Sequence, residues 1–90
     1  MDTLQNTYLE LTERGLAKGQ YDFSRHWLGR DRSYFSSLKA RKQEAGARTM
    51  LKLATNLTKA MVMARAERRN SDAALLDRLS SRIWNSVMAG

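Results

Sequence analysis

The sequence predicts an all-α fold, a compact bundle of about five helices that ends in a C-terminal amphipathic helix. The 90 residues contain no Pro and only five Gly, so long stretches are free of helix-breaking residues. Apolar residues recur at intervals of three and four, which is the period of a helix with one buried face. With 42% hydrophobic and 28% charged residues, the composition is that of a folded globular domain.

The first helix is expected over residues 3–14. Its apolar stripe consists of Leu4, Tyr8 and Leu11. Gly15 follows and can adopt the left-handed conformation that ends a helix, with Leu16 supplying the apolar contact of such an end. A helix stop at Gly15 is therefore predicted.

Two short helices are expected next, over residues 20–28 and over residues 32 to about 41, separated by Gly29 and Arg30. Asp31 is a suitable N-cap for the second of them. The apolar positions of the pair are Phe23, Trp27 and Leu28, then Phe35 and Leu38. We assign Trp27 and Phe35 to packing.

Two longer helices complete the chain. One begins at about Ala47, and its stripe is Met50, Leu53, Ala54, Leu57, Met61 and Ala64. The other follows a capping sequence at residues 70–72, and its stripe is Leu75, Leu76, Leu79, Ile83, Trp84 and Val87.

The charge is unevenly placed along the chain. The formal net charge is +7, yet residues 1–24 are acidic overall. Residues 25–52 carry eight Lys or Arg against only Asp31 and Glu44, a block of net charge +6. Such a block indicates a surface that binds phosphates, although a basic face that is merely solvated would have the same composition.

Two short helices joined by a glycine-containing turn, the second opening with polar and basic residues, form the arrangement that lets a helix enter the major groove of DNA. The segment 20–38 resembles the helix-turn-helix of small bacterial and phage repressors of the Cro and lambda-repressor type. Gln20 matches their frequent Gln at the start of the second helix, Phe23-Ser24 their apolar-small pair, and residues 33–36 the opening of their recognition helix. The alignment leaves one extra residue near Gly29, so the turn is expected to be longer than in those proteins.

The expected DNA contacts follow from the direction in which Phe35 and Leu38 are buried. Arg32 is the first candidate for reading a base, since Arg makes the commonest specific contact to guanine. Ser33, Ser36 and Ser37 are expected to point away from the core, with Arg41 at their flank, although a plain solvated helix face would have the same residues. Phosphate contacts are expected from Gln20, Arg30, Lys39, Lys42 and Arg48. The role of Tyr34 is left open.

Other functions find little support. The chain has no Cys and a single His, His26, so no set of metal ligands is expected, and no cofactor is predicted. No nucleophile with a partnering base and no phosphate-binding glycine loop is present, so an enzyme is not expected. No run of about 20 apolar residues predicts a membrane helix, and a cytoplasmic, nucleoid-associated protein is expected.

The last helix has more apolar surface than so small a core obviously needs. We divide the chain into residues 1–69, the helix-turn-helix domain, and residues 70–90, a dimerisation helix. Helix-turn-helix proteins usually bind paired half-sites as two-fold dimers. The predicted dimer contacts are Leu76, Leu79, Ile83, Trp84 and Val87. The alternative is that this helix completes the monomer's own core.

The sequence thus predicts a homodimeric regulator of transcription that binds specific double-stranded DNA sequences. One alternative is a protein-interaction module, antitoxin-like or an antiactivator, built on a helix-turn-helix scaffold. Another is a non-specific nucleic-acid binder, for which the basic block alone would be enough.

Overall fold

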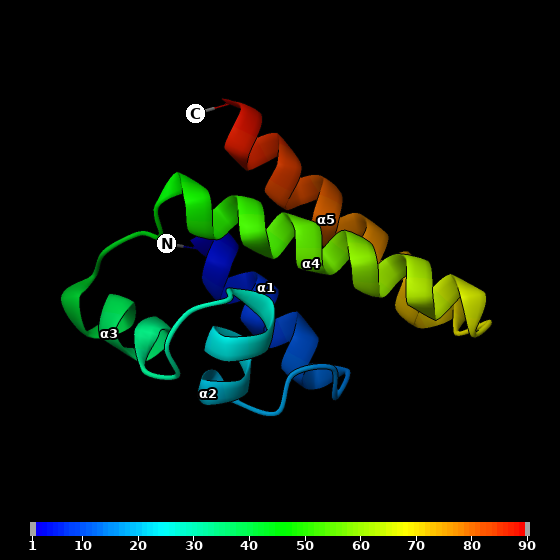
Figure 1. Cartoon of the computed structure of the whole chain (residues 1–90), viewed down its shortest axis with the longest axis horizontal. Helices are drawn as coiled ribbons and strands as arrows, with labels where there is room; N and C mark the ends of the chain where they lie inside the picture. Colours follow the sequence, from blue (N-terminus) through cyan, green and yellow to red (C-terminus); the bar gives the residue numbers. More distant parts are fainter. Residues whose placement is uncertain (1, 90) are drawn as a thin grey trace.

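The structure is a computed structural model that describes residues 2–89, and in this range it contains helices and no strand. The elements in order are α1 Asp2–Glu13, α2 Gln20–Asp22, the π-helical η1 Phe23–Trp27, α3 Tyr34–Arg41, α4 Ala47–Ala66 and α5 Asn70–Ala89. The predicted all-α bundle is confirmed. In Figure 1, α4 and α5 form a long antiparallel pair and α3 lies at one end of it.

The end of α1 follows the prediction from Gly15. This glycine has a φ of +71°, and the N–H of Leu16 donates to the carbonyl of Leu11 at 2.8 Å. Leu16 packs against the core beside the fully buried Leu11. The left-handed glycine and the apolar residue after it therefore close the helix together.

The second helix is continuous from α2 into η1, and its last five residues are π-helical. The N–H of Leu28 reaches back to the carbonyl of Phe23 at 3.0 Å, a bond across five residues. A π-turn inserts one residue into helical backbone. This part of the chain is therefore one residue longer than a regular α-helix would need to connect the same points.

The α3 helix begins at Tyr34, two residues later than the sequence predicts, because Arg32 and Ser33 belong to the turn. The buried hydroxyl of Ser24 accepts the N–H of Phe35 at 3.0 Å. The first N–H groups of a helix have no partner inside it. Ser24 of η1 thus supplies the side-chain hydrogen-bond acceptor that the N-cap residue, Ser33, does not provide.

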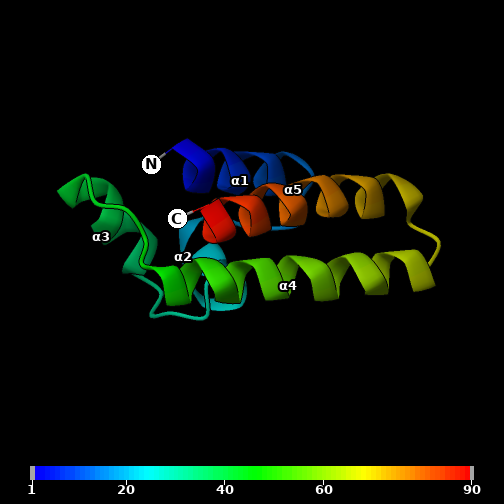
Figure 2. The same cartoon turned by 90° about the horizontal axis from the view of Figure 1, so that it is seen from above.

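The core lies where α4 and α5 pack against each other and against α1, η1 and α3. Figure 2 shows α4 and α5 side by side along their length, with α1 on the other side of α5. The stripes predicted for the two long helices provide most of the buried residues of this hairpin: Leu53, Ala54, Leu57 and Ala64 on α4, and Leu75, Leu76, Leu79 and Ile83 on α5.

The predicted dimer contacts need correction. Leu76, Leu79 and Ile83 are 1%, 0% and 0% exposed, because α5 folds back on α4 and buries this stripe inside the monomer. Trp84 and Val87 are half-buried, and both pack against the core. Leu76, Leu79 and Ile83 are therefore not available as dimer contacts, and residues 70–89 share one core with the rest of the chain.

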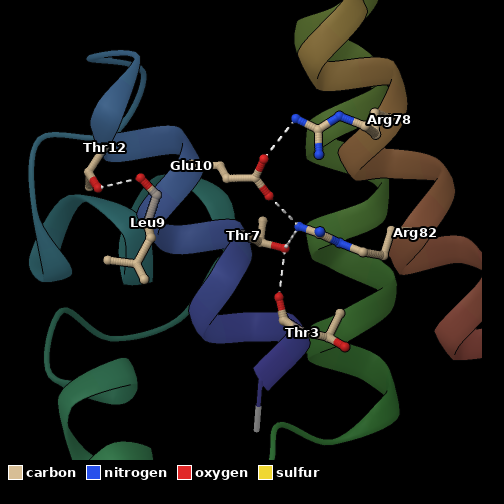
Figure 3. A network of polar contacts seen from close by, with 7 residues as sticks. All are labelled: Thr3, Thr7, Leu9, Glu10, Thr12, Arg78 and Arg82. Atoms are coloured by element: carbon tan, nitrogen blue, oxygen red, sulfur yellow. Dashed lines mark hydrogen bonds and ion pairs between the residues drawn. The ribbon is translucent and has the colours of Figure 1, made fainter.

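Ion pairs join α1 to α5 on the side away from α4. Glu10 accepts hydrogen bonds from Arg78 at 2.7 Å and from Arg82 at 2.8 Å, as Figure 3 shows. The bond from Arg78 lowers the pKa of the Glu10 carboxyl, against the opposing effect of burial, and Arg82 lowers it further. Just past the C-terminal end of α1, Arg14 pairs with Asp72 of α5 at 3.0 Å. Glu10 and Arg14 therefore tie the C-terminal half of α1 and the residue after it to α5.

Candidate nucleic-acid interface

The outer face of α3, together with the N-cap residue just before it, carries small side chains. Ser33 and Ala40 are exposed and Ser37 is half-buried. Ser36 departs from the prediction, because its hydroxyl donates to Oε1 of Gln20 at 2.7 Å and both residues are half-buried. Gln20 and Ser36 therefore connect α2 to α3, and Ser36 does not point freely outward as expected.

Arginines stand on both sides of this face. Arg32 is exposed, and its guanidinium lies over the ring of Tyr21 at 5.7 Å. On the other side the guanidinium of Arg30 lies over the ring of Tyr34 at 4.8 Å. An Arg held against an aromatic ring keeps its charge and its outward N–H groups while losing some of its conformational freedom. Tyr34, whose role the sequence left open, thus supports Arg30.

A shallow polar hollow brings several of the predicted residues together beside α3. Its lining is Gly29, Arg30, Asp31, Ser33, Tyr34, Ser37 and Arg41. Four of these residues, Arg30, Ser33, Ser37 and Arg41, are predicted DNA contacts. Two guanidinium groups and three hydroxyls in one open hollow form a surface suited to the anionic phosphate backbone of a nucleic acid.

Asp31 is the one acid in this hollow. Its carboxylate accepts the hydroxyl of Ser33 at 2.6 Å and the N–H of Ser33 at 3.4 Å. The hydroxyl of Ser33 lowers the pKa of Asp31, and the backbone N–H adds to this effect. Asp31 is therefore not the N-cap of α3, as the sequence predicts, but binds Ser33 in the turn just before the helix.

The remaining predicted phosphate contacts are spread out. The ammonium group of Lys39 lies over the ring of Phe35 at 5.4 Å, on the side of α3 that faces Thr3 and Val87. Lys42 is exposed at the end of α3 and has a φ of +53°. Arg48 is exposed in the first turn of α4. The structure does not gather these three residues into the hollow.

The arginines that form ion pairs and the basic block 25–52 occupy different parts of the molecule. Five arginines form ion pairs with carboxylates, and they lie just after α1, in the second half of α4, in the turn that follows it, or on α5: Arg14, Arg65, Arg69, Arg78 and Arg82. Within residues 2–89, none of the eight Lys and Arg of the block 25–52 forms an ion pair. The positive charge of this block is therefore not cancelled by ion pairs within the described part of the molecule.

The α4 helix supports the turn through residues that sequence reasoning did not single out. The amide Nδ2 of Asn56 donates to the carbonyl of Trp27 at 2.9 Å, at the end of η1. The hydroxyl of Tyr34 donates to that of Thr49 at 3.4 Å. Lys52 lies against Gly29, whose φ is +67°. Thr49, Lys52 and Asn56 share one side of α4, and this spacing is the only sequence signal for their role.

His26 and Asp22 form a pair on the surface of the second helix. Burial raises the pKa of Asp22, but the N–H of Lys18 and the ring of His26 outweigh it and leave this pKa below its usual value. Among residues 2–89 no group of three or more His, Cys, Asp or Glu is placed to hold a metal ion. In the same range no helix has the length and apolar character needed to cross a membrane.

These features define a small all-α protein in which two short helices, joined by a turn, carry a basic surface at one end of a helical hairpin. A family model matches residues 4–89, and the chain belongs to that family, DUF6626, described as a family of unknown function. No curated protein and no solved structure matches the chain.

Proposed function

We propose that this chain binds double-stranded DNA in a sequence-specific manner and regulates transcription, with the outer face of α3 in the major groove. The observation that carries this proposal is the outer face itself: small side chains in the middle, with Arg32 on one side and Arg30 and Arg41 on the other. A major groove of about 12 Å accepts one α-helix, and small side chains let its backbone approach the base edges closely.

The two kinds of contact differ in what they provide. In this proposal Arg30, which precedes α3, and Arg41, its last residue, bind backbone phosphates, which gives affinity without sequence preference. Arg32 stands just before the first turn of α3, where a guanidinium can make two hydrogen bonds to a guanine. The small hydroxyls of Ser33 and Ser37 can donate to or accept from either bases or phosphates. A protein of this kind would act at the nucleoid.

The first experiment selects bound duplexes from fragmented genomic DNA and sequences them. The selected site and a random duplex are then compared by fluorescence anisotropy over a range of salt concentrations. We expect a difference of at least about 10³-fold in affinity, as specific DNA-binding proteins show. Equal affinity for the selected and random duplexes would leave only non-specific binding and contradict the proposal.

Variants separate the two roles. Arg41→Ala should weaken binding to both duplexes and reduce the salt slope by about one unit, because one phosphate contact is lost. Arg32→Ala should cost roughly 1–3 kcal/mol on the selected site and much less on the random one. The matched control is Arg68→Ala, which removes the same charge at the turn between α4 and α5, the opposite end of α4 from α3. If Arg68→Ala weakens binding as much as Arg41→Ala, the net charge of the chain and not this interface is responsible.

A further inference from the structure

An uncharged strip runs along one side of the α4–α5 hairpin. It consists of Leu51, Thr58 and Val62 on α4 and Ser81, Trp84 and Met88 on α5. The intervals of seven and four on α4, and of three and four on α5, keep each set on one side of its helix. The Nε1 of Trp84 donates to the hydroxyl of Thr58 at 3.2 Å, which joins the two sets into one surface.

The strip holds apolar groups that the monomer leaves in solvent. Leu51 is 45% exposed, Val62 57% and Met88 82%, and Trp84 between them is half-buried. Within residues 2–89 these are three of only six large hydrophobic side chains that are exposed. None of them contributes to the outer face of α3. Neighbouring exposed apolar groups of this kind mark an interaction surface.

The charges around the strip indicate what covers it. The strip itself has no charged residue, and at one end Arg65 and Asp77 face each other at 3.8 Å and offset each other's charge. An acidic protein or a nucleic acid would find no cation within the strip to bind, and Arg65 at its end is paired with Asp77. Two copies of a chain of net charge +7 repel each other through most of their surface, and a strip without cations is where they can meet.

The size of the hairpin is sufficient for a dimer. The helices α4 and α5 have 20 residues each, so each is about 30 Å long and about 10 Å wide. Side by side, as Figure 2 shows, they present a face of about 600 Å². Two such faces bury about 1,200 Å² together, which reaches the lower end of stable protein–protein interfaces.

We propose that the chain forms a homodimer through this strip, with Val62 and Met88 of each copy packed against the hairpin of the other. Trp84, a predicted dimer contact, lies at the centre of the strip, whereas the buried Leu79 and Ile83 do not take part. The dimer does not depend on DNA, so the test is made in its absence and stands apart from the proposed function.

Sedimentation equilibrium of the intact protein at micromolar concentration should give twice the 10.3 kDa mass of one chain. Val62→Lys should raise the dissociation constant by about tenfold or more, because it places a cation of each copy in the interface. Met88→Lys should act in the same direction. The control is Leu9→Lys, which adds the same charge at an apolar residue of α1 that is 43% exposed and lies outside the strip.

Circular dichroism shows whether each variant keeps its helices, and because both strip residues are exposed, both variants are expected to do so. The proposal is overturned if the intact protein stays monomeric up to ~100 μM, a concentration at which even weak specific complexes form. It is equally overturned if Leu9→Lys dissociates the dimer as far as Val62→Lys and Met88→Lys do.

Discussion

Replacing Ser24 by Ala should lower the free energy of unfolding by about 1–3 kcal/mol. The hydroxyl of Ser24 is fully buried and accepts the N–H of Phe35 at 3.0 Å, in the first turn of α3. Ala removes the acceptor but leaves the donor, and a buried N–H without a partner bears its full desolvation cost. The cavity that Ala leaves is small, because only one oxygen is removed, so the lost hydrogen bond accounts for most of the effect.

Urea unfolding followed by circular dichroism measures this change. A small domain has a slope of about 1–1.5 kcal/mol/M in urea, so the midpoint should fall by roughly 0.7–3 M. Ser37→Ala is the matched control, since Ser37 also lies on α3 but its hydroxyl makes no hydrogen bond within the described residues. It should change stability by less than about 0.5 kcal/mol. If the two variants have equal midpoints, the bond from Phe35 to Ser24 does not hold α3 in place.

Two further predictions concern the turn and the contact between α1 and α5. Gly29→Ser should cost about 1–2 kcal/mol in thermal unfolding, because Gly29 has a φ of +67° and a Cβ would lie 3.0 Å from side-chain carbons of Lys52. Gly46→Ser, with a φ of −70° and nothing within 4 Å of its Cβ position, should be neutral or stabilising, and an equal loss at both glycines would contradict this account. The lowered pKa of Glu10 means that its contribution to stability is complete above the ordinary pKa of 4.5 and is lost as the pH falls through the lower value of the folded state. Glu10→Gln should therefore destabilise the protein at pH 6 but progressively less below pH 4.5. The control is Glu13→Gln, because the Glu13 carboxylate forms no ion pair within residues 2–89. A Glu10→Gln effect that does not change with pH, or an equal effect of Glu13→Gln, would refute the role of the Glu10 carboxylate.

Local signals predicted the helices well. The stripe of α4 and the stop at Gly15 depend on residues within one or two turns of each other, and helical periodicity and glycine geometry describe such short-range effects directly. The sequence predicts that α3 begins at Arg32, two residues before its actual start, because Asp31 has the chemistry of an N-cap. In the structure Asp31 binds Ser33 in the turn, and the buried Ser24 of the preceding helix supplies the acceptor for α3.

The sequence patterns do not predict contacts between residues that are far apart in the chain. The stripe of α5 shows which face is apolar but not which surface covers it, so Leu79 and Ile83 suited a partner chain as well as they suited α4. Asn56 gives a similar lesson, because its bond to the carbonyl of Trp27 joins residues that are 29 positions apart. Ser36 seemed free from its place on α3 alone, and only the position of α2 brings Gln20 to its hydroxyl.

The two proposals make different demands on the same chain, and we assign each of them to a different surface. The arginines around α3 need a long-range positive potential, whereas self-association needs a surface where like charges do not meet. The ion pairs lie away from α3: Glu10 of α1 binds Arg78 and Arg82, Asp72 of α5 binds Arg14 and Arg69, and Glu67 in the turn binds Arg69. This leaves the block 25–52 basic and the strip beside Trp84 uncharged. One helix in one groove contacts few base pairs, so a second copy joined through the strip would add a second half-site and raise specificity and affinity together.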